Sequence, residues 1–146
     1  MTTVHKSALV PYLAEQMYDL VNDIDSYPEF LPWCSNANVL ERSESELLAS
    51  ITVSGVGFSK SFTTRNTLEL NRSVVMQHVD GPFKSLTGTW TFTPLSDQGC
   101  RIELEMDFEV TAGMMAKIFG KFFDKASNKL VDAFTERAKT LYGDGA

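Results

Sequence analysis

Hydrophobic and polar residues alternate along most of the middle of the chain, over residues 36–111. The alternation is clearest over residues 101–110, where charged residues separate Ile102, Leu104, Met106, Phe108 and Val110. A period of two is typical of strands with one buried face. With a shorter segment near the N-terminus, it predicts seven strands, over residues 3–10, 37–43, 46–54, 58–70, 73–80, 85–95 and 100–111. Short turns between consecutive strands after residue 36 predict antiparallel pairing.

Helical spacing of apolar residues replaces this alternation on both sides of the main strand region. The first such segment starts at Ala14 and runs to Ile24, and it predicts a short helix. The second predicts one continuous helix over residues 113–142, which Gly143 ends. Its apolar residues share one face of that helix, and they are Met115, Ile118, Phe119, Phe122, Phe123, Ala126, Leu130, Ala133 and Phe134.

The segment DIDSYPEFLPWC, residues 23–34, joins the first helix to the following strands. Ser26 and Glu29 have the spacing of a capping box, in which each side chain bonds to the backbone N–H of the other residue. Pro28 fits a first helical turn, and Pro32 disfavours helical geometry in the residue before it. We therefore predict a second short helix of about one turn, followed by a compact elbow.

These elements predict an α+β domain that spans residues 1–146. A sheet with one apolar face and a helix with one apolar stripe have to cover each other, so we expect the C-terminal helix to lie across the sheet. The length of 146 residues fits a single domain. No apolar run approaches the roughly 20 residues that would cross a bilayer.

Charge is distributed unevenly along the chain. The net charge is −6, with +2 on residues 113–146 and −8 on the rest. An acidic body argues against binding of DNA or generic nucleic acid by the whole surface. Cys34 and Cys100 stand apart without a CxxC spacing, so we expect two buried free thiols and no metal site. Because the N-terminus lacks the pattern of a signal or transit peptide, we also expect a cytoplasmic location.

Residues suited to catalysis are few. His5 and His78 are the only histidines, and no GxSxG, HExxH or Walker A motif occurs. Thr64 and Asn66 share the strand face of Phe62 and are expected to point inward, where they would need hydrogen-bond partners from the protein or a ligand. The sequence contains no evident nucleophile–base pair, so we expect no catalytic residues and no enzymatic activity.

Ten phenylalanines, six methionines and two tryptophans are a large number for a chain of this length. They are compatible with two arrangements. One is a densely packed aromatic core, and the other is an apolar cavity between the sheet and the C-terminal helix that holds a hydrophobic ligand. Composition alone does not distinguish a filled core from a cavity.

Lysines recur at every fourth position of the predicted C-terminal helix, at Lys117, Lys121, Lys125 and Lys129. No acidic residue precedes the first three by four positions, so the ion pairs of an ordinary solvated helix face are absent there. The row is either a solvated face or a contact surface for RNA phosphates or an anionic membrane. Arg137 falls within the apolar face. We expect its side chain to extend into water, the alternative being that it anchors a carboxylate or a polar ligand group.

Four stretches resemble the START-like superfamily (polyketide cyclase/dehydrase proteins), and within it the group of coenzyme Q-binding proteins and RatA-type ribosome association toxins. They are ALVPYLAEQMYDLVNDIDSYPEFLPWC, FSKSFTTRN, DGPFKSLTGTWTFTPL and AFTERAKTLY. The resemblance covers nearly the whole chain. It implies a helix-grip fold, in which a curved antiparallel sheet of about seven strands wraps around the long C-terminal helix, with two short helices after the first strand and an apolar cavity inside. One departure is Leu13, where a small polar residue would cap the first helix.

The resemblance also implies two functions. Coenzyme Q-binding members bind ubiquinone and support respiratory electron transport, which predicts ubiquinone or a similar isoprenoid lipid as the ligand and no other cofactor. RatA-type members bind the large (50S) ribosomal subunit, block subunit association and inhibit translation. We rank ubiquinone binding first and ribosome binding second, and we note that the two are compatible. Peripheral contact with an anionic membrane is a further expected interaction.

Under this interpretation, SYPEFLPWC places Phe30 and Trp33 at the mouth of the cavity, with Tyr27 and Cys34 packed behind them. The ribosome or an anionic membrane would contact the lysine row, which comprises Lys117, Lys121, Lys125 and Lys129. The candidate ligand-binding residues are Val21, Phe30, Trp33, Phe62, Trp90, Phe92, Met106, Phe108, Met115, Phe119, Phe122 and Phe123.

Overall fold

The alternating segments form seven antiparallel strands in one sheet. The computed structural model describes residues 2–55, 57–96 and 99–143. The strands are β1 (Thr2–Val10), β2 (Cys34–Arg42), β3 (Glu46–Gly55), β4 (Phe58–Glu69), β5 (Ser73–Asp80), β6 (Phe83–Ser96) and β7 (Gly99–Val110). Their order across the sheet is β1-β7-β6-β5-β4-β3-β2, so β1 pairs with the last strand of the chain. The seven predicted strands are confirmed, although several bounds move by one to three residues.

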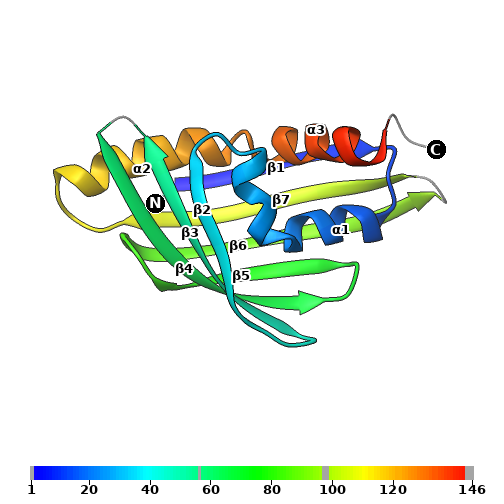
Figure 1. Ribbon diagram of the computed structural model, residues 1–146, viewed down its shortest axis with the longest axis horizontal. Helices are drawn as coiled ribbons and strands as arrows, with labels where there is room; N and C mark the ends of the chain where they lie inside the picture. The colour runs from blue at the N-terminus through cyan, green and yellow to red at the C-terminus, as the bar shows by residue number, and fades with distance from the viewer. Residues whose placement is uncertain (1, 56, 97–98, 144–146) are drawn as a thin grey trace.

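The sheet curls around the C-terminal helices. In Figure 1, β2, β3 and β4 cross in front of β5, β6 and β7, while α2 (Met114–Ser127) and α3 (Leu130–Tyr142) lie along β1 and β7. Helix α1 (Ala14–Asn22) contacts α3, β6 and β7, and the 3-10 helix η1 (Ile24–Glu29) contacts β2. This arrangement is the expected helix-grip fold, in which helices cover the buried face of a curved sheet.

The prediction of one continuous C-terminal helix is wrong, because the chain turns between α2 and α3. The Asn128 side chain donates through Nδ2 to the backbone oxygen of Asp124 at 2.8 Å and to its carboxylate at 3.0 Å. The Lys129 N–H bonds to the oxygen of Ala126, three residues back, instead of the fourth residue back. Side-chain bonds to the helix backbone and a tightened turn are both known causes of helix interruption.

The predicted capping box in the elbow is also wrong, although the short helical turn is confirmed. Helix η1 begins at Ile24, before Ser26, and no side chain caps its start. The Ser26 N–H bonds to the backbone oxygen of Asp23 at 3.1 Å. The Glu29 carboxylate accepts from the Arg137 guanidinium at 3.0 Å. A charge-assisted bond of this kind is stronger than a neutral bond to a backbone N–H, which favours the ion pair over the cap.

The ends of the other helices follow their local chemistry. Leu13 precedes α1 without a capping side chain, and the Gln16 side chain instead accepts from the Leu13 N–H at 2.9 Å. Gly143 ends α3 with φ of 81° and an N–H bond to Lys139 of 2.9 Å, as predicted. Among the described residues, no helix has the length and hydropathy needed to cross a membrane.

The buried face of α2 is narrower than the predicted apolar face. Ala116, Phe119 and Phe123 are buried, whereas Met115 is 47% exposed and Ile118 is 44% exposed. At 100° per residue, the last two lie on the flank of a stripe centred between Phe119 and Phe123. The prediction that Met115 and Ile118 face the sheet is therefore wrong, and both side chains are left on the surface beside the lysines.

Candidate ligand cavity and basic surface

An apolar cavity lies between the concave face of the sheet and the helices. Its volume is about 70 Å³. The elbow, the strands β3 to β7 and both C-terminal helices contribute to its wall. The residues that line it are Ile24, Tyr27, Trp33, Ala49, Ile51, Phe62, Thr64, Asn66, Met76, Leu86, Trp90, Met106, Phe123, Ser127, Leu130 and Phe134.

The structure places part of the predicted ligand-binding set on this wall. The members that line the cavity are Trp33, Phe62, Trp90, Met106 and Phe123. The members buried in the packed core away from the wall are Val21, Phe92, Phe108 and Phe119. Phe30 and Phe122 are half-buried outside the wall, and Met115 lies on the surface.

Several wall residues are absent from the predicted set, and the sequence carries a signal for only some of them. Leu130 and Phe134 belong to the predicted apolar face of the C-terminal helix. Ala49 and Ile51 alternate on β3, but alternation does not reveal which part of a strand borders an unfilled space. Ser127 lies on the inner side of α2 and has no apolar signal, so its place on the wall is visible only in the tertiary structure.

Three polar side chains interrupt the apolar wall. Thr64 and Asn66 on β4 are each 4% exposed, and the Thr64 hydroxyl donates to Asn66 Oδ1 at 2.8 Å. The prediction that both point inward is confirmed. Ser127, at the end of α2, is 1% exposed, and its hydroxyl has no hydrogen-bond partner among the described residues. Buried polar atoms of this kind are uncommon because each unmade hydrogen bond costs stability.

The elbow is held to α1 and α3 by specific contacts. The hydroxyl of Tyr27, which lines the cavity, donates to the backbone oxygen of Val21. Burial raises the pKa of that phenol well above its ordinary value, so it stays protonated. Phe30 packs edge-on against Phe134, with ring centroids 5.2 Å apart, and Arg137 lies 5.0 Å above the Phe30 ring.

The prediction that Arg137 extends into water is wrong. Its side chain is only 15% exposed and pairs with the Glu29 carboxylate at 3.0 Å. Glu29 is 62% exposed, so this pair lies at the rim of the elbow and is screened on one side by water. The arginine therefore joins α3 to the elbow instead of reaching into the cavity, whose lining does not include it.

A larger groove lies on the outside of the elbow, with a volume of about 540 Å³. We call it the outer groove, and it is lined by Leu31, Pro32, Trp33, Phe122, Lys125, Ala126, Lys129, Asp132, Ala133 and Glu136. Trp33 belongs to the lining of both the outer groove and the cavity. Its side chain therefore borders both spaces.

The four lysines Lys117, Lys121, Lys125 and Lys129 are all exposed, along α2 and the turn that follows it. Within the described ranges, none of their ammonium groups forms an ion pair. We call this set the lysine ridge. Lys125 and Lys129 also line the outer groove, so the ridge and the groove are continuous.

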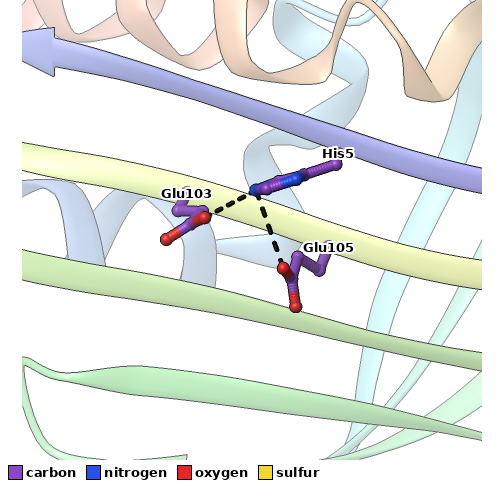
Figure 2. A group of neighbouring side chains, drawn as sticks. All are labelled: His5, Glu103 and Glu105. Atoms are coloured by element: carbon purple, nitrogen blue, oxygen red, sulfur yellow. Dashed lines mark hydrogen bonds and ion pairs between the residues drawn. The ribbon is translucent and has the colours of Figure 1, made fainter.

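On the face of β1 and β7 that points away from the buried core, His5 lies between Glu103 and Glu105 (Figure 2). Its Nε2 atom is 2.6 Å from the Glu103 carboxylate and 3.6 Å from that of Glu105. The antiparallel register of β1 and β7 brings these distant residues together, so the cluster was not evident from sequence spacing. All three are water-accessible, and the imidazole lies within hydrogen-bond distance of the Glu103 carboxylate.

The fold and cavity agree with the comparison to known families. Residues 10–135 match the family described as polyketide cyclase / dehydrase and lipid transport. The chain belongs to this family. A START superfamily protein from Mycobacterium smegmatis has the same fold, with a TM-score of 0.78 and 21% sequence identity over 95% of this chain and 98% of that one.

Two relatives by sequence differ in how much they share with the chain. The ribosome association toxin RatA of Escherichia coli is 51% identical over 142 residues, which cover 97% of this chain and 90% of that protein. A mitochondrial coenzyme Q-binding protein homolog from Xenopus laevis is 28% identical over 142 residues, which cover 94% of this chain and 58% of that protein. The similarity to the ribosome association toxin is thus both higher and more complete.

Proposed function

We propose that this protein associates with the ribosome through the lysine ridge, and that binding to the large subunit interferes with subunit association. The observation that carries the proposal is a row of four exposed ammonium groups that form no ion pair with any described residue, on a protein whose net charge is −6. The 51% identity to a ribosome association toxin supports it. This reverses the order of the two functions expected from the sequence, in which ubiquinone binding came first.

Charge concentration explains how such a ridge would bind RNA phosphates. A protein with an acidic body is repelled by nucleic acid except where its cations are gathered. Each lysine that neutralises a phosphate releases a counterion, so binding through the ridge weakens steeply with salt. The exposed Met114, Met115 and Ile118 at the start of α2 lie beside Lys117 and give this end of the surface an apolar component.

The triple charge reversal Lys117→Glu, Lys121→Glu and Lys125→Glu tests the ridge. We expect it to abolish co-sedimentation with purified large subunits, because three cationic contacts become repulsive. The control is Lys6→Glu, Lys60→Glu and Arg101→Glu, which changes the net charge equally at exposed positions on other surfaces. Retained binding by the first variant, or equal loss by both, would place the ribosome contact elsewhere or attribute it to net charge.

A second function is favoured by the cavity. We infer that it takes a neutral hydrophobic ligand, with ubiquinone or a similar isoprenoid lipid as the leading candidate. An apolar wall, an adjacent outer groove and the match to a lipid transport family support this inference. We further propose that the protein acts by binding alone, with no catalytic step and no cofactor besides that ligand.

Native mass spectrometry tests ligand binding directly. The protein would be purified without detergent from a quinone-producing bacterium and measured before and after denaturation. We expect an added mass that matches an isoprenoid quinone and is lost on denaturation. An unliganded mass that persists after incubation with excess quinone would exclude this ligand class. The Lys117→Glu and Lys121→Glu reversals should leave the added mass unchanged, because neither side chain lines the cavity or the outer groove.

A further inference from the structure

We propose that the cavity recognises the oxygen-bearing end of its ligand by donating hydrogen bonds from Ser127 and Asn66, while the apolar remainder passes Trp33 into the outer groove. The proposal rests on the ligand-binding function above and specifies the ligand's chemistry and orientation. It predicts a neutral molecule with a carbonyl oxygen at one end and a hydrocarbon chain at the other.

The Ser127 hydroxyl is the strongest indication of a missing partner. It is 1% exposed, lines the cavity, and has no hydrogen bond among the described residues. Serine in a helix often bonds to the carbonyl four residues back, and that bond is not made here. A buried hydroxyl left unpaired costs stability, so a ligand group that accepts a hydrogen bond from it would be bound favourably.

Thr64 and Asn66 supply the second indication, from the sheet side of the cavity. The Thr64 hydroxyl donates to Asn66 Oδ1 at 2.8 Å, which fixes the orientation of the amide. With that oxygen engaged, the remaining hydrogen-bonding capacity of the Asn66 side chain is chiefly that of its two N–H donors. The two sides of the cavity thus both offer donors, which suit an oxygen acceptor such as a carbonyl.

The rest of the wall determines which acceptors are suitable. None of the described residues that line the cavity carries a charge. A carboxylate or phosphate would lose its hydration there without gaining a counter-charge, which costs several kcal/mol or more. A ketone or quinone carbonyl loses much less, because it is neutral and can accept from both Ser127 and Asn66.

The volumes determine the orientation. The cavity measures about 70 Å³ and the outer groove about 540 Å³. Sites that enclose a small organic ligand usually measure about 300–1,000 Å³, so the cavity holds one end of a ligand and not a long chain. Leu31, Phe122 and Ala133 give the outer groove apolar surface for a hydrocarbon chain, and Trp33 is the side chain that the chain has to pass.

The experiment compares two probes with the same carbon skeleton, 2-hexyl-1,4-benzoquinone and hexylbenzene, of which only the first carries carbonyl oxygens. Binding is followed by the fluorescence of Trp33 and Trp90, which both line the cavity. The variants are Ser127→Ala and the double replacement Thr64→Val with Asn66→Leu, which removes the polar pair together. Thr135→Val is the matched control, since its hydroxyl bonds to the backbone of Val131 outside the cavity.

We expect each cavity variant to weaken quinone binding by about fivefold, the value of one lost hydrogen bond, and to change hexylbenzene binding by less than about twofold. Thr135→Val should leave both affinities unchanged. Equal affinities of the variants and the wild type for the quinone would overturn the proposal while preserving an apolar ligand site. Failure of both probes to bind the wild-type protein would instead refute ligand binding itself.

Chain length tests the orientation. In the wild-type protein, lengthening the alkyl group from methyl to hexyl should raise quinone affinity, because the added methylenes bury apolar surface in the outer groove. Phe122→Ala should reduce that gain, and thermal unfolding monitored by circular dichroism verifies that the variant is folded. A gain that is unchanged in Phe122→Ala would show that the chain lies elsewhere and would overturn the head-inward orientation.

Discussion

Two neighbouring regions of the interior contrast in how completely they are filled. The phenylalanine cluster is packed ring against ring, and it comprises Phe62, Phe83, Phe108, Phe119 and Phe123. The ring centroid of Phe83 lies 5.1–5.9 Å from the centroids of the other four rings. The cavity borders this cluster and shares Phe62 and Phe123 with it, yet it leaves about 70 Å³ empty. Similar residue types therefore form a solid core in one place and border an empty space in the next.

The difference comes from small and polar residues placed opposite large ones. On the cavity wall, Ala49, Thr64 and Ser127 face a space bordered by Trp33 and Trp90. Small side chains leave room, and polar side chains prevent neighbouring apolar groups from collapsing into it without cost. In the phenylalanine cluster, edge-to-face contacts fill the equivalent space. The contrast teaches that a few small and polar residues are enough to leave a cavity in an otherwise ordinary aromatic core.

The largest expected effect belongs to the filled region. Phe119→Ala should lower the free energy of unfolding by about 3–5 kcal/mol, because Phe119 is fully buried and packs on Phe83 and Phe123. Urea denaturation measures the change. Met114→Ala on the same helix is the control, and since Met114 is 78% exposed it should change stability by less than about 0.5 kcal/mol. A small effect of Phe119→Ala would mean that this region tolerates cavities too.

Trp33→Ala should separate binding from stability at the boundary between the regions. The side chain is half-buried, so we expect a stability loss of only about 1–2 kcal/mol. Affinity for the quinone probe should fall by about tenfold or more, because the ring contacts both the cavity and the outer groove. Denaturation and fluorescence titration measure the two effects. Equal losses in both would assign Trp33 to the core.

The elbow contacts should be weaker and unequal. Arg137→Ala removes a mostly buried side chain that packs on Phe30, with an expected loss of about 1–2 kcal/mol. Glu29→Gln keeps that packing and removes only a half-screened ion pair, so the loss should stay below about 1 kcal/mol. Thermal unfolding compares the variants. Similar losses from both would mean that the ion pair, and not the packing, holds the elbow.

Ser127→Ala should not lower the free energy of unfolding of the unliganded protein and should raise it by up to about 1 kcal/mol. The replacement removes a buried hydroxyl that has no partner among the described residues. Denaturation with and without the quinone probe measures the change. The phenylalanine cluster contains no hydroxyl that could be removed for comparison. Thr135→Val therefore provides the comparison, and it should be destabilising because the Thr135 hydroxyl is hydrogen-bonded. A clear loss for Ser127→Ala would indicate a partner for the hydroxyl.

Thiol reactivity should show the smallest effect. Cys34 and Cys100 are free and buried, as predicted, and burial raises the pKa of Cys100 to about 11. At pH 8 about 0.1% of such a thiol is ionised, so the native protein should react with a thiol reagent far more slowly than the unfolded protein. Neither thiol lies in the phenylalanine cluster. Rapid reaction in native buffer would show that the region around the cavity opens readily.

Local patterns in the sequence determined much of the fold. Alternation over residues 36–111 was sufficient for the strands, since a period of two requires only that each strand bury one face. The lysine ridge was predicted from the spacing of lysines on a helix, and the inward orientation of Thr64 and Asn66 from the alternation along their strand. The resemblance to START-like proteins supplied what periodicity cannot, namely that the sheet curves around the C-terminal helix.

Only the tertiary structure decided which side chains meet. The helix break coincides with the Asn128 side-chain bonds to Asp124 and the shortened Lys129 bond to Ala126, and the Arg137–Glu29 pair joins residues 108 positions apart. Likewise, the cavity lies where the fold brings Ala49, Ser127 and Trp90 from three different elements to one wall. Periodicity assigns a residue to a face, but an unfilled volume depends on which large and small residues are brought opposite each other, and that is a property of the packed fold.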